Sequence, residues 1–455
     1  MKRIACILSL LAGICLISFP VLAQEAAEAA TATAAAEEAA AEPAAELNGA
    51  NTAWILTATA LVLFMTIPGL SLFYAGLVGR KNVLSVLMHC FMITAVMSVL
   101  WLIFGYSFAF GDASPYFGGF GSILASGITA ESMSGDIPEF LFFGFQMTFF
   151  IITPALMVGA FVERMKFSAM LLFTSIWALV VYAPVCHWVW GGNGFMLESG
   201  TMDLAGGIVV HITAGIGALA ACIMVGPRKG YPTAQFQPHS LPLCVTGTGM
   251  LWVGWFGFNA GSQLAANGDA AQTLVVTHLS AATATIVWSL AEKIKNGKAS
   301  VLGAVTGSIA GLAAITPASG EVGPIGALAI GAASGFICWY ASVILKAKLG
   351  YDDSLDVVGV HGVGGLVGTI LVAFFAASTL GGKRSVEAVG DEKGYEVGSQ
   401  LMTQLTSSAI TVVYTLVVSI IILKVVGMIC GGLRVSDSEE EDGLDIAAHG
   451  ESGYN

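Results

Sequence analysis

Two stretches decide the fold: Asp203-Leu-Ala-Gly-Gly-Ile-Val-Val-His211 and Asp356-Val-Val-Gly-Val-His-Gly-Val363. Each places a Val-His pair inside an apolar run, and a glycine follows four residues after each histidine. Ionisable side chains are rare inside membrane-spanning segments, and they mark function where they occur. His211 and His361 are therefore the first candidates for a functional site, and their matched surroundings indicate an internal repeat.

The composition predicts a polytopic membrane protein. The 455-residue chain is 56% hydrophobic and only 11% charged, whereas soluble domains have about 25% charged residues. Its 56 glycines suit close helix contacts in lipid. Apolar segments that could each span a membrane lie at 52–75, 83–111, 139–161, 167–187, 204–226, 240–261, 271–291, 300–316, 323–345, 357–380 and 400–430.

The fold class that follows is all-α, with eleven transmembrane helices. The two histidines fall in the fifth and tenth segments. Because five is odd, the two five-helix halves have opposite orientations and form inverted repeats, with a long eleventh helix after them. A site between such repeats is expected near the middle of the membrane.

Basic residues in the loops predict an N-terminus outside and a C-terminus in the cytoplasm. The only basic residues in the predicted outer loops lie in the 381–399 loop, which holds three. The predicted inner loops hold Arg80, Lys81, Arg164, Lys166, Arg228, Lys229, Lys293, Lys295, Lys298, Lys346 and Lys348.

The ends of the chain are predicted to lie outside the spanning region. Residues 1–23 are typical of a cleaved signal peptide, with Lys2 and Arg3 before an apolar stretch and a small-residue site ending at Ala23. The alternative is a first transmembrane anchor. Residues 24–50 form an Ala/Glu-rich extracytoplasmic linker, or a short helix. The transporter domain is expected over 51–430 and a cytoplasmic tail over 431–455.

His211 and His361 allow two interpretations. Each could be a neutral core histidine hydrogen-bonded across a helix pair. If the two meet near the pseudo-axis, one ring donates while the other accepts, and the pair can pass a proton. A metal site is not expected, because two nitrogens without a carboxylate or thiolate make a poor zinc site.

Asp203 and several aromatic residues are predicted near the outer mouth. Asp203 begins the fifth segment, where it can cap a helix, offset an arriving cation, or do both. Ser262 follows Phe258 by one helical turn. The aromatic residues suit either the interfacial belt or a cation–π cage; they are Phe145, Trp188, Trp190, Trp255, Phe256 and Phe258.

Other functional classes lack support in the sequence. No G-x-x-x-x-G-K-[ST] motif is present for ATP, and no basic patch for nucleic acid. The six cysteines after the signal stand singly in apolar segments, so packing is the simplest interpretation. No catalytic group stands out, so neither an enzyme nor a cofactor is expected.

Several long motifs in the same order resemble the ammonium transporter (Amt) family, in its bacterial branch. The resemblance runs from about residue 52 to the end of the chain. Besides the two histidine stretches, the motifs are Thr66-Ile-Pro-Gly-Leu-Ser-Leu-Phe-Tyr-Ala-Gly76, Gly159-Ala-Phe-Val-Glu-Arg164, His187-Trp-Val-Trp-Gly-Gly192 and Gly254-Trp-Phe-Gly-Phe-Asn-Ala-Gly-Ser262.

The resemblance implies a homotrimer in which every subunit has its own pore. It implies that Trp190, Phe145 and Ser262 form the external ammonium recruitment site, with the Asp203 carboxylate beneath it. It implies that Phe145 and Phe258 form the stacked ring pair that closes the pore. His211 and His361 match the twin histidines of the pore lumen.

The tail, Gly432-Leu-Arg-Val435 through Gly443-Leu-Asp445 and His449-Gly450, also resembles the family's tail. That likeness implies docking of a PII-type signal protein, which blocks the pores when nitrogen is plentiful. The alternative is a solvated acidic terminus. The linker and the 381–399 loop are longer than the family pattern.

The residues and the resemblance together predict an inward ammonium transporter. The resemblance alone implies that it lies in a bacterial inner membrane and that methylammonium is a further substrate. An ion is costly to move through an apolar lumen, so ammonium is expected to lose its proton near the Phe145/Phe258 gate. Ammonia then passes, and the proton follows through the histidines. The alternatives are a passive ammonia gas channel and a sensor that reports ammonium to a PII-type partner.

Overall fold

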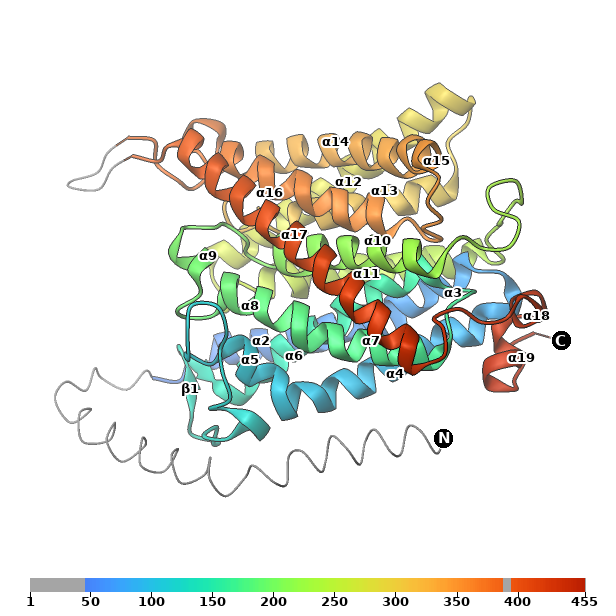
Figure 1. Cartoon of the computed structure of the whole chain (residues 1–455). Helices are drawn as coiled ribbons and strands as arrows, with labels where there is room; N and C mark the ends of the chain where they lie inside the picture. Colours follow the sequence, from blue (N-terminus) through green and yellow to red (C-terminus); the bar gives the residue numbers. More distant parts are fainter. Residues whose placement is uncertain (1–45, 388–393, 455) are drawn as a thin grey trace, which may run out of the picture. The chain divides into compact units, whose positions relative to one another are not determined.

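The computed structural model describes residues 46–387 and 394–454, and all of its helices belong to the compact unit Asn48–Asn455 (Figure 1). The predicted signal peptide and the linker up to residue 45 lie outside the described residues. The first helix begins at Gly49, two residues before the predicted domain boundary, because the Asn48 side chain accepts hydrogen bonds from the N–H groups of Ala50 and Asn51.

The first half of the bundle ends with the helix that carries His211. Its α-helices are α2 Gly49–Phe64, α3 Ser71–Leu77, α4 Val83–Leu100, α5 Tyr106–Phe110, α6 Glu139–Phe161, α7 Phe167–Trp177, α8 Ala183–Trp190, α9 Phe195–Glu198 and α10 Thr213–Val225. Between them lie π-helical segments at Met65–Leu70, Trp101–Gly105, Ala178–Tyr182 and Gly207–Ile212, and 3-10 turns at Arg80–Asn82 and Ile123–Ala125. A two-residue hairpin, β1 Met133–Ser134 with β2 Ile137–Pro138, is the exception to the all-α prediction.

The second half carries His361 and ends in the long helix and the tail. Its α-helices are α11 Leu241–Gly261, α12 Gly268–Asn296, α13 Val301–Ile315, α14 Pro324–Tyr340, α15 Lys346–Leu349, α16 Val363–Phe375, α17 Val397–Ile429, α18 Asp437–Asp442 and α19 Leu444–His449. π-Helical segments lie at Ala341–Leu345 and Val358–Gly362, and a 3-10 turn at Ser378–Leu380. The helix α17 runs obliquely across α16, α10 and α7 (Figure 1).

Each of the eleven predicted segments coincides with helix. Among the described residues, ten helical runs are long and apolar enough to cross a membrane. The predicted eighth segment is α13, whose 15 residues span only about 22 Å of a hydrocarbon core about 30 Å thick. By length and composition, ten helices in the described part of the chain can therefore span a membrane, and the eleventh crossing remains a prediction.

A break between α2 and α3 shapes the centre of the bundle. Pro68 has no N–H to donate, and Ile67 has extended backbone angles, φ −126° and ψ 108°. The residues on either side of this break, Met65 and Leu70, both face the central cavity described below.

The tail folds back onto the end of the bundle that carries Lys81, Arg164 and Arg228, called here the basic end. The helix α18 starts with a capping box between Ser436 and Glu439. Further contacts between the tail and the bundle are the Arg434 N–H donated to the Pro227 carbonyl, the Val435 N–H donated to the Arg164 carbonyl, and the Lys229–Glu441 ion pair.

Candidate functional site

His211 and His361 meet in the middle of the bundle. Their Nδ1 atoms are 3.2 Å apart, and their ring planes differ by 21° with centroids 5.2 Å apart. Both side chains are buried. At this distance one neutral ring donates its N–H and the other accepts. The pair is the arrangement that the matched Val-His motifs predicted.

Matched backbone segments position the two histidines. His211 lies in the π-helical segment before α10, and His361 in the π-helical segment before α16. A Cβ on Gly215 would lie 2.2 Å from the Gly362 Cα atom, and one on Gly365 would lie 2.9 Å from the His211 Cβ atom. Glycine at these positions thus allows the two helices to approach closely enough for the rings to meet.

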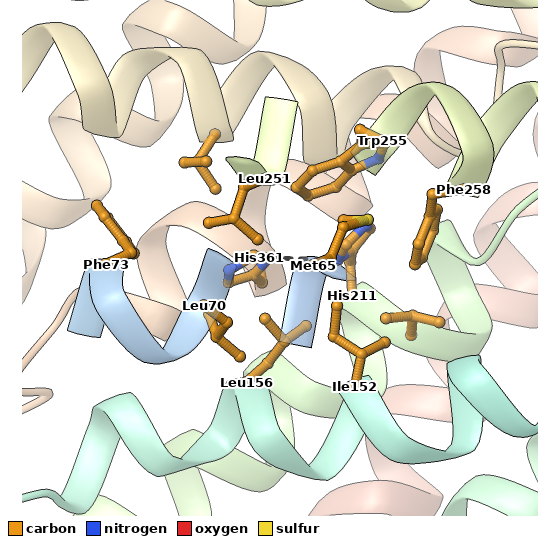
Figure 2. Close-up of a pocket in the computed structure, with 12 residues that line it drawn as sticks. Met65, Leu70, Phe73, Ile152, Leu156, His211, Leu251, Trp255, Phe258 and His361 are labelled. Carbon is orange, nitrogen blue, oxygen red and sulfur yellow. Dashed lines mark hydrogen bonds between the residues drawn. The ribbon is translucent and has the colours of Figure 1, made fainter. Parts of the chain in front are cut away.

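The histidine pair lines a narrow apolar cavity of about 10 Å³ (Figure 2), which is close to the volume that holds a single water. The Nε2 atom of His211 is buried and has no hydrogen-bond partner among the described residues. The remaining lining residues are Met65, Leu70, Phe73, Ile152, Leu156, Val210, Leu251, Trp255, Phe258 and Ile309. Figure 2 shows Phe258 at one end of this row and Phe73 at the other.

Aromatic rings from α11 flank His211. The Trp255 and Phe258 rings lie at 5.5 and 6.1 Å from the imidazole, and both are close to parallel with it. Trp255 is fixed by its indole N–H, which donates to the Thr316 hydroxyl at 2.9 Å. The histidine on this side is therefore held between rigid rings.

The predicted partner of Phe258 was wrong. The ring that packs against Phe258 is Phe149, at 4.4 Å and 44°. Phe145 lies one turn earlier on α6, contacts Phe149 edge-on at 5.0 Å, and is fully buried near Gly261. Residues i and i+4 share a helix face, so the sequence alone could not decide which of these rings reaches α11.

A second cavity, of about 200 Å³, lies on the other side of the Phe149–Phe258 pair and is called here the vestibule. Trp190, Phe149 and Ser262 line it, whereas Phe145 does not. The Ser262 hydroxyl donates to the Phe258 carbonyl at 2.8 Å, so its oxygen can accept a hydrogen bond from a ligand. The other lining residues are Phe110, Phe142, Gln146, Val189, Leu197, Leu204 and Leu264.

Two of the predicted mouth aromatics lie elsewhere. The indole N–H of Trp188 donates to the Tyr116 carbonyl, and its ring packs on Tyr414. Phe256 faces His278 on α12. The high aromatic density around these positions therefore serves packing as well as the vestibule.

Asp203 is a helix-start cap beneath the vestibule. One carboxylate oxygen accepts the N–H groups of Gly206 and Gly207, and the other accepts those of Ile208 and Val209, at 2.6 to 3.2 Å. Its own carbonyl accepts the Trp190 indole N–H at 2.8 Å. The capping interpretation is confirmed, and the same residue links the fifth segment to the vestibule tryptophan.

A matching aspartate, Asp353, was missed from the sequence. It lies eight residues before His361, as Asp203 lies eight before His211. It accepts the Val358 N–H at 2.8 Å. Burial raises the pKa of Asp353 to about 6, while nearby Lys346 acts in the opposite sense. The equal spacing of eight residues between each aspartate and its histidine could have identified Asp353. The quoted motif begins at Asp356 instead, so that aspartate drew attention away from Asp353.

Comparison with known proteins agrees with this geometry. The sequence profile of the Ammonium Transporter Family matches residues 53–454. The chain belongs to the ammonium transporter family. The resemblance inferred from the motifs is thus confirmed, and the family is one of transporters and channels rather than enzymes.

Relatives of this transporter cover nearly its whole length. It is 47% identical over 411 residues to a putative ammonium transporter of Methanothermobacter thermautotrophicus, covering 90% of this chain and 99% of the relative. It is 43% identical over 414 residues to an ammonium transporter of Aquifex aeolicus, covering 90% and 94%.

Solved structures give the same picture of this transporter. A protein titled Sensor Amt Protein superposes with a TM-score of 0.81 at 28% identity, covering 88% of this chain and 98% of that one. Mep2 of Candida albicans superposes at 0.79 with 34% identity, covering 87% and 88%. The chain is therefore a multi-pass membrane protein with the fold of this family.

Proposed function

We propose that this transporter moves ammonium inward by separating it into ammonia and a proton at the Phe149–Phe258 pair. The observation that carries the proposal is the histidine pair, with Nδ1 atoms 3.2 Å apart in an apolar cavity of about 10 Å³. A lumen that narrow and apolar suits a small neutral molecule, and the coupled imidazoles offer the proton a separate path.

Recruitment takes place in the vestibule. A cation there faces the aromatic surfaces of Trp190 and Phe149, and the Ser262 oxygen accepts one of its N–H bonds. The Asp203 carboxylate adds a negative charge near neutral pH: burial raises its pKa to about 6, and the four backbone N–H groups act in the opposite sense by favouring the ionised form. Phe145 contributes indirectly, through its edge-on contact with Phe149.

Selectivity follows from desolvation. Passage beyond the Phe149–Phe258 pair requires loss of the hydration shell in a low-dielectric lumen, which costs an ion several kcal/mol or more. Ammonium avoids this penalty by leaving its proton behind. Sodium and potassium have no such route, so the same rings exclude them.

The proton then crosses through His211 and His361. One ring takes the proton at a free nitrogen and releases another across the Nδ1–Nδ1 hydrogen bond. The unpartnered Nε2 atom of His211 is a free position of this kind. The second ring then releases its Nε2 proton toward the basic end, which leaves both rings in the opposite tautomers. A return of the shared proton between the Nδ1 atoms, together with proton exchange at the Nε2 atoms, restores the starting state.

The topology that suits this transport has eleven crossings and two inverted five-helix repeats. The matched Asp203–His211 and Asp353–His361 pairs support the repeat, and the contact of the tail with the basic end supports a cytoplasmic C-terminus. We place the chain in a bacterial inner membrane as a homotrimer, with a cleaved signal peptide over 1–23, by resemblance to the family.

The tail is the proposed regulatory element. Its acidic helix α18 is anchored by Arg434, whose guanidinium donates to the Glu440 carboxylate at 2.5 Å. A PII-type protein docking at the basic end would contact α18 and the inner loops together. Loss of regulation on removal of residues 431–455, with uptake retained, is the expected result.

The experiment that tests the transport proposal is an ammonium pulse on proteoliposomes adsorbed to a solid-supported membrane. A saturating inward positive current, reduced by Asp203→Asn or by replacing both histidines, is expected. No current despite rapid internal alkalinisation would establish the gas channel instead, and the histidine path would be wrong.

A sensor is the second candidate function, because a structural neighbour at 28% identity carries that title. The vestibule and the histidine cavity favour transport, since a sensor needs only the first of them. Uptake of methylammonium by cells that carry this chain as their sole ammonium transporter separates the two.

A further inference from the structure

The contact between α19 and the start of α4 aligns two histidines. The Asp445 carboxylate accepts the Ser85 N–H, and the Leu444 N–H donates to the Asn82 side chain, both at 2.8 Å. His449 lies one turn after Asp445, and His89 lies one turn after Ser85. The register of the docked tail therefore brings these two imidazoles to the same place.

Phe167, at the start of α7, touches both imidazoles. Its ring lies nearly parallel to His89, at 5.7 Å and 18°, and edge-on to His449, at 5.2 Å and 83°. His89 is 1% exposed. The three rings thus join the tail to two helices of the bundle.

Several polar atoms in this contact have no hydrogen-bond partner within the described part of the chain. They are both ring nitrogens of His89, Nε2 of His449 and the second carboxylate oxygen of Asp445. A buried polar atom without a partner costs about 1–3 kcal/mol. The contact that holds the tail is therefore sensitive to a change in the charge of either imidazole.

A proton is the ligand that suits this place. No group of three His, Cys, Asp or Glu side chains in residues 46–387 and 394–454 is arranged to hold a metal ion. Histidine is the side chain whose charge ordinarily changes between pH 5 and 8. The two imidazoles share one buried contact through Phe167, so a positive charge on either ring repels a positive charge on the other.

We propose that the His89–Phe167–His449 contact is a proton-sensitive latch that holds the C-terminal tail on the bundle while both imidazoles are neutral. A proton on either ring places a cation in the buried contact beside the second imidazole. Acidification of the cytoplasmic side then releases the tail. The proposal rests on the docked tail and not on the transport mechanism.

The other charged groups around the latch are already engaged or lie at its edge. Asp445 and Glu451 face His449 from the tail, and Asp445 accepts the Ser85 N–H. Immediately before α7, Lys166 donates to the Gly431 carbonyl at 2.8 Å. In the 3-10 turn before α4, Lys81 donates to the Glu440 carbonyl.

The direction of the pH effect follows from burial. Burial lowers the pKa of His449 below its ordinary value, although Asp445 and Glu451 act in the opposite sense. The released tail therefore binds a proton more readily than the docked tail. Docking is complete above the ordinary histidine pKa of about 6.5 and weakens as the pH falls below it.

Amide hydrogen exchange of the tail in the full-length protein tests the latch. Exchange of residues 437–454 is compared at about pH 7.5 and about pH 5.5, relative to a free peptide of the same sequence, and protection should fall about tenfold for one histidine that gains a proton. The His89→Gln, His449→Gln double variant should show no such fall. The matched control is His239→Gln, since His239 also contacts the tail, through Tyr454 at 3.2 Å, but has partners for both nitrogens.

Either of two results would overturn the latch: equal protection of the wild-type tail at both pH values, or an unchanged fall in the double variant. His449→Gln alone guards against misfolding of the bundle, because it changes only the tail. That variant should stay docked at about pH 7.5 and lose the pH response. A tail already released there would show that the imidazole itself, rather than its neutral state, is what holds the contact.

Discussion

The Asp203–His211 arm and the Asp353–His361 arm share a backbone plan but differ in the charged groups around the aspartate. In both, an aspartate precedes a π-helical segment that carries a histidine eight residues later. Four N–H groups hold the Asp203 carboxylate, and within the described residues it has no cationic partner. Asp353 accepts from Val358 and lies beside Lys346, which donates to its carbonyl at 3.1 Å.

This difference indicates a division of labour between the arms. Backbone N–H groups hold the Asp203 carboxylate in place, while burial raises its pKa to about 6, and in the proposed mechanism this carboxylate acts on a cation in the vestibule. Lys346, whose ion-pair partner is Asp356, lies beside Asp353 and partly offsets its charge. Among the described residues, no aromatic pair closes that side of the cavity in the way that Phe149 and Phe258 close the other. In the proposed mechanism, the Asp203 arm is the entrance that attracts ammonium and the Asp353 arm is the exit that does not retain it. Such an arrangement suits inward transport.

The largest effect is expected from removing the two carboxylates in turn. In Asp203→Asn, the vestibule loses its negative charge. Two of the four N–H donors before His211 also lose their acceptor, at a cost of about 1–3 kcal/mol each, which weakens the segment that positions this histidine, so uptake should fall at least about tenfold. Asp353→Asn leaves only the Val358 donor affected and should retain most of the uptake. Methylammonium uptake per correctly folded protein measures both, and equal losses would remove the distinction between the arms.

The next effect concerns the two histidines. An acidic side chain at position 211 or 361 places a negative charge in the cavity and should weaken potassium exclusion about tenfold, which corresponds to about 1.4 kcal/mol. His211→Asp should have the stronger effect, because His211 lies next to the aromatic entrance. Potassium current in proteoliposomes is the measurement. Unchanged selectivity in both variants would count against the histidine relay.

A smaller effect separates Phe149 from Phe145. Phe149→Ala removes the ring that packs on Phe258 and should lower the selectivity for ammonium over potassium several-fold. Phe145→Ala removes a buried ring and should lower stability by about 3–5 kcal/mol without opening the pore. Potassium current and Tm, taken together, distinguish the two. Potassium leakage through the Phe145 variant alone would restore the gate that the sequence predicted.

The last effect, which concerns stability rather than transport, is the pH dependence at Asp353. Its pKa is raised by burial to about 6 from 3.8. The folded state therefore binds the proton more tightly, and the stability that this group contributes is lost as the pH rises from about 4 through about 6. Asp353→Asn should gain stability relative to wild type over that range, by on the order of 1–3 kcal/mol. A difference in Tm between variant and wild type that does not change with pH would contradict the assignment.

The sequence carried much of the fold, because long apolar segments have few alternatives to spanning helices. Predicted segment 139–161 coincides with α6, and the other segments match their helices to within a few residues in most cases. The histidine pair was predictable from two matched motifs. The directions of the aromatic side chains were not predictable, because the facing helix decides which ring of a dense aromatic run reaches the pore. Phe145 and Trp188 are examples, since both pack against other rings instead.

Two further features could not be predicted from the sequence. Asp353 is recognisable only by comparison with Asp203, because an aspartate in a loop does not by itself predict a functional role. The docked tail depends on contacts such as Asp445 with Ser85, whose residues lie far apart in the chain. A solvated acidic terminus and a docked one have the same composition, so only their contacts distinguish them.

The most direct test of the central claim is the ratio of charge to nitrogen, measured by recording current and internal pH together in proteoliposomes during an ammonium pulse. Separation of ammonia and proton, with both delivered inward, predicts one positive charge for each nitrogen that enters, and a loss of that charge when His211 and His361 are both replaced by phenylalanine. Ammonia entry with no charge in the wild-type protein would contradict the account.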